Sequence, residues 1–437
     1  MTLKELLLFG LILFFALFTR LFRLGYPAAM YFDEIYHVPA AVLMQNGDFK
    51  TPFESTSSVS GEQNTIDWLH PPLAKYFQAL SISIWGVAAV AWRLPSVIFS
   101  LLTLVVFYFF VRFLGKNFFF KKESLSKKID SSSNLALIAS FFLSLDGLFL
   151  VQSRIAMNDV FVLFFVISAV SIYFIYLVKK KPLLLFLSGT LFGLALASKW
   201  SALWILLFLL VKELVVLKNV KKLPFLLFSL ILTPAFIYLL SYLPMFWQGK
   251  DIVDFFLFQK TILFSQLVNP STHLYSSDPL TWMLNLRPVW YFAAHSTESW
   301  VSNIYALNNP ILCLYLVATF LISILFLIKR KLNSLTHTVV YLIFFLYLFS
   351  FLPWLFFSRI MFIYHYLLAL PFLIILLSYF FILFSKKIED AARKRAVIFN
   401  FLFWPLLFFI LFYPHWTAIP VPTEFAQTVY FLLPSWR

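Results

Sequence analysis

Long apolar stretches, separated by short basic or polar segments, constrain this chain more than any other feature of its sequence. A helix needs about 20 apolar residues to cross a bilayer core of about 30 Å. With 62% hydrophobic and only 12% charged residues, the chain has too little polar surface to enclose its apolar residues in water. We therefore predict an all-α polytopic membrane protein with eleven spans, at residues 4–22, 93–114, 134–151, 159–178, 182–198, 200–217, 223–245, 309–328, 335–355, 360–385 and 396–413.

A further apolar run, residues 73–91, contains Lys75 and Gln78 and follows two prolines. Basic residues decide its placement, because loops on the cytoplasmic side carry an excess of Lys and Arg. If the N-terminus is cytoplasmic and this run does not cross, every basic cluster falls on the cytoplasmic side; the clusters lie within 116–128, 179–181, 218–222, 329–331 and 386–395. We expect residues 73–91 to form a juxtamembrane or re-entrant helix on the external face of the cell membrane.

The same topology places two long polar segments, residues 24–92 and 246–308, on the external side together with most carboxylates. Long loops with such residues are typical places for function. We expect three parts: an N-terminal catalytic membrane module (1–245), an external loop (246–308), and a C-terminal membrane region with an external tail (309–437). The net charge of +15 comes from clusters between apolar runs, so membrane lipids are expected as partners and nucleic acid is not.

An acidic pair, Asp33-Glu34, follows the first predicted span. A carboxylate at the external membrane boundary can serve as a general base toward a hydroxyl nucleophile. An Asp-Glu pair in a loop is more often merely solvated, but the flanking Tyr31, Phe32 and Tyr36 favour a more enclosed position. We take the pair as the candidate catalytic acids.

Several basic residues lie near external helix ends, where the positive-inside bias disfavours them. Arginine binds phosphate with two parallel hydrogen bonds, so this placement indicates an anionic ligand. Anchoring by lipid headgroups is the alternative, and Lys75 could be an interfacial lysine. We also expect Asp159 to orient Arg154. The candidate phosphate contacts are Arg20, Lys75, Arg93, Arg154 and Lys199.

The order of several segments resembles that of the protein O-mannosyltransferases. These segments are "FDE", "HPPLAKYFQALSIS", "AWRLPS", "LDGLFLVQSRIAMND" and "LALASKW", followed by "HLYSSDPLTWMLNLRPVWYF", "NNPILCLYL" and "FLPWLFFSRIMFIYHYLLALPFL". The segment 246–308 is too short for the β-trefoil insertion of eukaryotic members, so the chain resembles a prokaryotic member. It departs from the family in having His273-Leu274-Tyr275 where the family has His-Pro-Tyr.

The resemblance implies a GT-C fold with about eleven transmembrane helices and juxtamembrane helices in the first external loop. It also implies transfer of mannose, with inversion, from a polyprenyl-phosphate carrier to Ser/Thr hydroxyls of proteins. By position, Asp33 would be the base, with Glu34 beside it, and Arg20, Arg93, Arg154 and Lys75 match the family's basic residues. Further substrate contacts are expected from His70, Asp159, His365 and Tyr366.

Two other functions stay open. A transferase of the aminoarabinose type shares the fold and the early acidic pair, but modifies a lipid. A transporter or flippase would show paired halves and ions near the middle of its spans, which the sequence does not show. Motifs for nucleotide binding or for a zinc site are absent. The donor that the resemblance implies already carries a good leaving group, so no nucleotide is needed, and because basic residues can cover its phosphate, no metal or other cofactor is expected.

Overall fold

A computed structural model describes residues 1–54, 66–67, 69–121, 130–267, 273–297, 299–328 and 335–436. Some of the basic residues used to predict the topology lie outside these ranges, namely Lys122, Lys127, Lys128, Lys329, Arg330 and Lys331. The described chain is helical apart from one small sheet.

The α-helices of the first part of the chain follow one another with short connections. They are α1 (Leu3–Leu21), α2 (Glu34–Gln45), α3 (Thr51–Glu54), α4 (Leu73–Trp85), α5 (Ala89–Leu114), α6 (Ser131–Ser144), α7 (Gly147–Gln152), α8 (Asp159–Lys179), α9 (Pro182–Ser198), α10 (Leu203–Val215), α11 (Leu223–Leu227), α12 (Thr233–Leu240) and α13 (Leu243–Trp247). Short 3-10 and π turns extend or join them; these are η2 (Gly115–Phe119), η3 (Trp200–Ala202), η4 (Val220–Lys222) and η5 (Phe228–Leu232).

The remaining elements include the sheet. The α-helices are α14 (Ile252–Leu267), α15 (Pro279–Trp282), α16 (Pro310–Ile328), α17 (Leu335–Phe351), α18 (Leu370–Lys386), α19 (Ala391–Thr417) and α20 (Thr423–Phe425). The turns are η6 (Leu352–Phe356), η7 (Ile363–Leu368), η8 (Ala426–Tyr430) and η9 (Pro434–Trp436). The strands β1 (Val289–Thr297), β2 (Trp300–Ala306) and β3 (Val421–Pro422) form an antiparallel sheet in the order β1-β2-β3, with Val289 opposite Ala306 and Val301 opposite Val421.

Six helical segments of the described chain are long and apolar enough to cross a membrane, and α6, α9 and α18 are shorter apolar helices. The six are Ala89–Phe119, Asp159–Lys179, Val220–Leu240, Pro310–Ile328, Thr336–Phe356 and Ala391–Thr417. The chain is therefore a multi-pass membrane protein. Each of the eleven predicted runs overlaps at least one helix, while the number of crossings stays a prediction.

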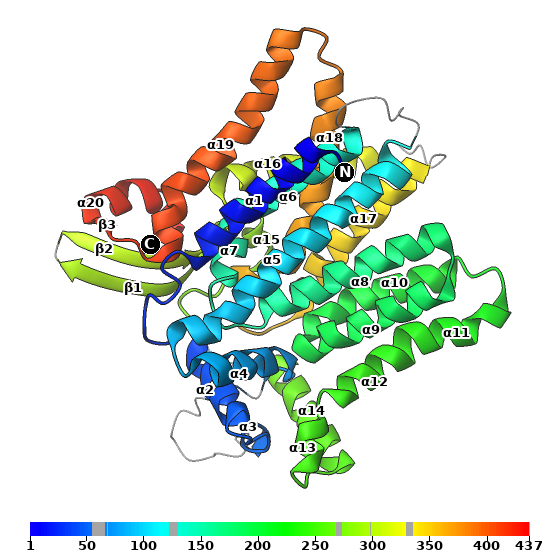
Figure 1. The fold of residues 1–437 in the computed structure, drawn as a ribbon, viewed down its shortest axis with the longest axis vertical. Helices are drawn as coiled ribbons and strands as arrows, with labels where there is room; N and C mark the ends of the chain where they lie inside the picture. Colours follow the sequence, from blue (N-terminus) through cyan, green and yellow to red (C-terminus); the bar gives the residue numbers. More distant parts are fainter. Residues whose placement is uncertain are drawn as a thin grey trace.

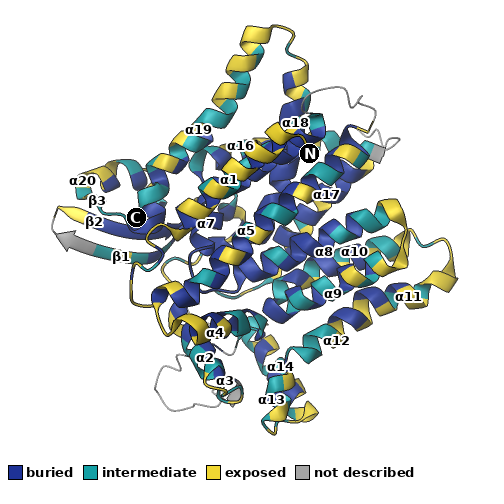
Figure 2. Ribbon diagram, viewed as in Figure 1, coloured by how far each residue is buried: buried dark blue, intermediate teal, exposed yellow. Residues whose placement is uncertain are grey.

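The long helices pack side by side around α8, which is buried along most of its length (Figures 1 and 2). A helix that is apolar on all sides and buried belongs in a core. By contrast, α1 and most of α19 expose large apolar side chains on the outside of the bundle (Figure 2). These exposed apolar faces are suited to contact with lipid.

Two glycines allow α9 to approach η5 and α12 closely. A Cβ atom added at Gly189 would lie 1.8 Å from the carbonyl oxygen of Ser229, and one at Gly193 would lie 2.6 Å from the Cβ of Ile237. Small residues at such contacts permit close helix packing in membranes. This contact fixes α9 against the η5–α12 segment and so shapes the groove described below.

The short helices α2, α3 and α4 lie together at one end of the bundle (Figure 1). Helix α4 has 13 residues and ends at Gly86, whose φ of 77° is the left-handed conformation that glycine adopts easily. At about 1.5 Å per residue, α4 is about 20 Å long, shorter than a bilayer core of about 30 Å. The sheet was not predicted: β1, β2 and α14 lie within the segment 246–308, which we expected only as a loop.

Candidate functional site

The carboxylate of Asp33 lies at the start of α2, in the connection that follows α1. The preceding residue, Phe32, has a left-handed backbone (φ 50°), and its ring stacks on Tyr291 of β1 at 3.9 Å. Asp33 is the N-cap residue of α2, yet its side chain makes no capping hydrogen bond, and the described residues provide no other donor to it. A partly buried carboxylate of this kind is available to a ligand.

Charged groups from three other segments surround Asp33. The pKa of its carboxyl is raised to about 6, mainly by burial and less by the nearby carboxylates Asp67 and Asp159, while the charges of His37 and Lys199 oppose the shift. A carboxylate becomes a better proton acceptor as its pKa approaches the working pH. The site therefore has the features of a general base at neutral pH.

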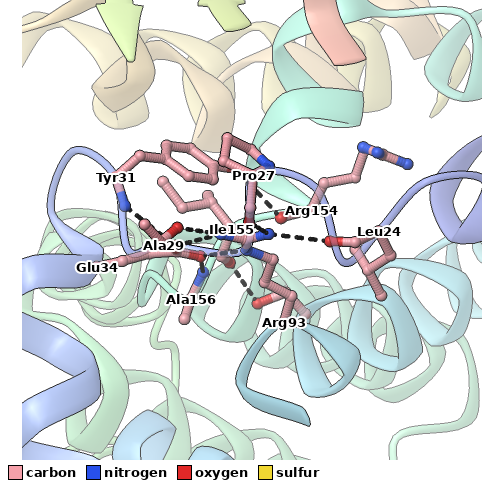
Figure 3. Close-up of polar contacts among 10 residues, drawn as sticks. Leu24, Pro27, Ala29, Tyr31, Glu34, Arg93, Arg154, Ile155 and Ala156 are labelled. Atoms are coloured by element: carbon pink, nitrogen blue, oxygen red, sulfur yellow. Dashed lines mark hydrogen bonds and ion pairs between the residues drawn. The ribbon is translucent and has the colours of Figure 1, made fainter. Parts of the chain in front are cut away.

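Glu34, in contrast, is buried and fully engaged (Figure 3). Its two carboxylate oxygens accept hydrogen bonds from Nε and Nη2 of Arg93, both at 2.8 Å. They also accept from the backbone N–H groups of Ala156 and Tyr31. These contacts join the start of α2 to α5 and to the connection between α7 and α8.

The remaining N–H groups of Arg93 donate to three carbonyl oxygens of the segment that leads to α2 (Figure 3): those of Leu24 at 3.0 Å, Pro27 at 2.7 Å and Ala29 at 3.1 Å. All five N–H groups of the guanidinium are thus used within the protein. The predicted phosphate contact by Arg93 does not fit this geometry, and neither does a proton-transfer role for Glu34. Both residues hold the segment that carries Asp33.

Arg154 and Arg20 are also engaged near the end of α1. Nη1 of Arg154 lies between 2.6 and 3.0 Å from the carbonyl oxygens of Thr19, Arg20 and Phe22. Arg20 is completely buried, donates to the carbonyl of Ala16 and places its guanidinium 4.8 Å from the centre of the Phe149 ring. In this arrangement the two arginines fix the end of α1, and Arg20 offers no surface to a ligand.

A buried cluster forms around Asp67. Its Oδ2 lies 2.7 Å from Nζ of Lys75 and 2.9 Å from Nδ1 of His37. The Lys75 ammonium, followed by the His37 and His70 rings, outweighs burial and holds the pKa of the Asp67 carboxyl well below its usual value. Lys75 also donates to the carbonyl of His70, whose ring stacks 5.9 Å from that of His37. The structure thus brings Lys75 and His70 together around Asp67, and Lys75 is already ion-paired.

Lys199 lies in the tight connection between α9 and η3. Its Nζ is 2.8 Å from Oδ1 of Asp159 and 5.2 Å from the centre of the Tyr364 ring. Oδ2 of Asp159 is buried and has no hydrogen-bond partner among the described residues. The expected pairing of Asp159 with Arg154 is wrong, since Asp159 pairs with Lys199. Of the predicted phosphate contacts, Lys199 is the one that the structure places next to Asp33.

The turn η7 contributes aromatic residues to the same region. Tyr364 lies 6.0 Å from Phe32 and lines the side of Lys199, whereas the Tyr366 hydroxyl is 3.4 Å from that of Tyr347 on α17. Tyr364, not the predicted Tyr366, therefore faces the site. The ring of His365 is buried 4.2 Å from Trp354, and its Nδ1 has no partner among the described residues.

An apolar groove with a volume of about 660 Å³ is lined by Trp200, the residue that follows Lys199, and by residues of several helices. We call it the α9–α14 groove, because residues of α9, η3, α10, η5, α12 and α14 line it. Trp200, the neighbour of Lys199, lies at its polar edge and donates from Nε1 to the Tyr238 hydroxyl at 2.9 Å. The rest of the lining is almost entirely aliphatic or aromatic, and several lining residues, such as Ile231 and Phe256, are exposed on the outside of the bundle.

His37, Asp67, Tyr291 and Tyr364 were not among the predicted site residues. His37 stands four residues after Asp33 on the same helix face, a spacing that could have indicated it. Nothing local distinguishes the other three, which come from different segments. Within the described ranges, no group of three or more His, Cys, Asp or Glu side chains is arranged to hold a metal ion.

Two adjoining family models match the chain. Residues 62–249 match the model described as dolichyl-phosphate-mannose-protein mannosyltransferase, and residues 251–436 match the C-terminal four-transmembrane region of protein-O-mannosyltransferase. A polyprenol-phosphate-mannose–protein mannosyltransferase of Corynebacterium glutamicum is 23% identical, covering 98% of this chain and 93% of its own. One of Mycolicibacterium smegmatis is also 23% identical, over 97% of this chain and 91% of its own.

The fold is similar to that of solved structures. A Saccharomyces cerevisiae protein O-mannosyltransferase Pmt1-Pmt2 complex bound to the sugar donor matches with a TM-score of 0.81 at 15% identity, covering 99% of this chain and 92% of that chain. ArnT from Cupriavidus metallidurans bound to undecaprenyl phosphate matches with a TM-score of 0.56 at 13% identity, covering 89% of this chain and 62% of that chain. At these identities the likeness shows the GT-C fold.

Proposed function

The chain belongs to the protein O-mannosyltransferase family, and from this premise we propose that it transfers a mannosyl group from polyprenyl phosphate mannose to Ser/Thr hydroxyls of proteins. One observation supports the assignment of the site above all others. The Asp33 carboxylate, with its pKa raised to about 6 and no hydrogen-bond donor from the described residues, lies within reach of the charge of Lys199, whose neighbour Trp200 lines an apolar groove.

In the proposed reaction the acceptor oxygen attacks the anomeric carbon of mannose while its proton passes to the Asp33 carboxylate. The bond between that carbon and the phosphate oxygen breaks, and its electron pair leaves with polyprenyl phosphate. Attack on the opposite face from the leaving group inverts the anomeric centre. Lys199, held by Asp159 in a site with little water, stabilises the negative charge that builds on the phosphate.

The other predicted site residues take supporting positions in this proposal. Glu34 and Arg93 hold the loop of Asp33, while Arg20 and Arg154 fix the end of α1. Lys75 and Asp67 position His37 and His70 along one side of the pocket, and His365 and Tyr364 close another. The acceptor polypeptide would approach from the side of α2 and the sheet.

We further propose that the site lies on the external face of the cell membrane. The basic clusters 179–181, 218–222 and 386–395 then lie on the cytoplasmic side, as the positive-inside rule requires. Eleven helical passes, with α2 to α4 as juxtamembrane helices, are compatible with this placement. The division into a catalytic module (1–245), an external segment (246–308) and a C-terminal membrane region (309–437) follows the same topology.

A transfer assay tests the function directly. Purified protein in liposomes is given polyprenyl phosphate mannose and a Ser/Thr-containing peptide, and mannosylated peptide is detected by mass spectrometry. Parallel reactions replace the sugar by aminoarabinose, or the peptide by a lipid acceptor. Transfer to lipid without transfer to peptide would establish the aminoarabinose-type alternative, and counterflow of a labelled solute without any transfer would establish a transporter.

The α9–α14 groove is the proposed site of the polyprenyl chain, because it is apolar, open to the side of the bundle and lined by Trp200, the residue that follows Lys199. Replacing Ala235, which lines the groove, by Trp should raise the KM for a long-chain donor at least about tenfold, which corresponds to about 60 Å² of lost apolar burial. A donor with a short isoprenoid should be affected far less. The measurement is KM for both donors in the same detergent.

The matched control is Phe236→Trp, a substitution on the same helix at an exposed residue that does not line the groove. It should leave both KM values unchanged. Equal effects of Ala235→Trp on the short and long donors would show that the chain binds elsewhere.

A further inference from the structure

A second groove, with a volume of about 470 Å³, lies between α16, α18 and the first turns of α19. The residues that line it are far from Asp33 in the sequence. We call it the α18–α19 groove. It is lined by Tyr315, Phe381, Phe384, Arg393, Ala396, Val397, Asn400 and Phe401. In Figure 1 this part of α19 diverges from α18 at the top of the view, and Figure 2 shows it largely exposed.

The wall of this groove is built from stacked aromatic rings. Phe401 stacks on Phe381 with ring centres 3.6 Å apart and on Tyr315 at 4.9 Å. Phe384, at the mouth, exposes 57% of its surface. Apolar rings that stay accessible between two membrane helices are suited to an acyl chain, which lies along them without loss of hydrogen bonds.

Positive charge gathers at one end of the groove. Arg393 lines it and is exposed, and Lys394 and Arg395 follow on α19, while α18 ends with Lys386 and Lys387. The nearby acids are Glu389 and Asp390, and the Asp390 carboxylate already caps α19 by accepting from the backbone N–H of Arg393. The connection between α18 and α19 is therefore basic overall; of these basic residues Arg393 lines the groove, whereas the Lys386 ammonium lies 4.3 Å from the centre of the Phe120 ring.

From this juxtaposition we propose that the α18–α19 groove binds an anionic phospholipid. Arg393 holds the phosphate of the headgroup, and an acyl chain lies against Phe381, Phe384 and Phe401. Basic pockets between helices on the membrane face that carries the Lys and Arg clusters are typical sites for anionic headgroups, and the planar guanidinium suits a phosphate. The site needs only that the chain is embedded in a membrane, so it does not depend on mannosyl transfer.

The experiment is lipid binding by native mass spectrometry of the full-length protein in detergent, titrated with phosphatidylglycerol or phosphatidylcholine. The wild type should bind phosphatidylglycerol more tightly. Arg393→Gln should weaken phosphatidylglycerol binding by about fivefold and leave phosphatidylcholine binding unchanged, in line with the contribution of one basic residue near an anionic headgroup. Ala396→Trp, which fills the groove without changing its charge, should weaken the binding of both lipids.

Two matched controls test whether the effects on lipid binding come from the groove itself and not from a general change of charge or side-chain size. Arg395→Gln removes the same charge, and Ala391→Trp adds the same ring, both at exposed α19 residues that do not line the groove. Neither should change lipid binding. Equal weakening by Arg395→Gln and Arg393→Gln, or unchanged phosphatidylglycerol binding in Arg393→Gln, would overturn the proposal. Thermal unfolding in detergent without added lipid checks that all four variants are folded.

Discussion

Replacing Asp33 by Asn should lower mannosyl transfer by about 10²- to 10⁴-fold, the range that a general base contributes. Asn keeps the size of the side chain but cannot accept the proton of the acceptor hydroxyl. Because the described residues provide no hydrogen-bond donor to the Asp33 carboxylate, the fold and donor binding should change little. The measurement is turnover of a Ser/Thr peptide at saturating donor, together with binding of polyprenyl phosphate.

The matched control is Glu424→Gln, which removes an exposed carboxylate of α20. It should keep the rate of the wild type. An Asp33→Asn variant with normal turnover would remove the assignment of Asp33 as the base, and one that loses donor binding as well would make Asp33 a structural residue.

The pH dependence of the wild-type rate follows from the same carboxylate. Asp33 acts as a base only when ionised, and burial raises its pKa from an ordinary value near 3.8 to about 6. Turnover should therefore be full well above pH 6 and fall as the pH is lowered through about 6, approaching tenfold per pH unit on the acid side. A rate that stays constant down to pH 4 would contradict this environment for Asp33.

Replacing Arg93 by Met should be the most destabilising single change in the site. It leaves the Glu34 carboxylate buried without its counter-charge, and breaking a buried ion pair by removing one partner costs about 3–5 kcal/mol. The carbonyls of Leu24, Pro27 and Ala29 lose their donors at the same time. Thermal unfolding of the purified protein in detergent measures the loss.

The double variant Glu34→Gln/Arg93→Met should recover part of the stability, because it no longer buries an unpaired charge. Arg112→Gln, which breaks the ion pair between Glu5 and an arginine that is 26% exposed at the other end of α5, serves as the control and should cost less, because the Tyr108 hydroxyl still donates to Glu5. If Arg93→Met unfolds like the wild type but loses polyprenyl phosphate binding, then Arg93 contacts the donor directly, as its position in the sequence first indicated.

Two features could be predicted because they depend on the local sequence: that the chain is a multi-pass membrane protein, and that Asp33 lies in the connection after the first helix. Apolar runs set the helices, and an acid following the first run marks the end of a span. Lys199 could likewise be predicted as a functional residue, because placing a lysine between two apolar runs costs free energy and such residues usually serve a function. That Lys199 meets Asp33 across 166 residues of chain depends on packing, which no local pattern describes.

Other parts of the site could not be predicted for the same reason. A basic side chain near a helix end looks the same in the sequence whether it faces a ligand or is used up by groups of the protein, so the roles of Arg93 and Lys199 could be told apart only by their partners. Tyr364 faces the site in place of the predicted Tyr366 because η7 is a 3-10 turn, in which side chains point in other directions than in an α-helix. The sheet was missed because register shifts between Trp290 and Phe292 and between His295 and Thr297 interrupt the pairing of β1 with β2, and such bulges break the regular alternation of a strand.

If the polyprenyl chain of the donor binds in the α9–α14 groove as proposed, the sideways opening of this groove lets the donor enter directly from the membrane. A donor that enters from the surrounding bilayer diffuses in two dimensions. Its rate of binding therefore depends on its mole fraction among the membrane lipids. Adding inert lipid to a fixed amount of enzyme and donor would then slow turnover, although nothing in the aqueous phase has changed. Kinetic constants for this enzyme are accordingly most meaningful when expressed per membrane area.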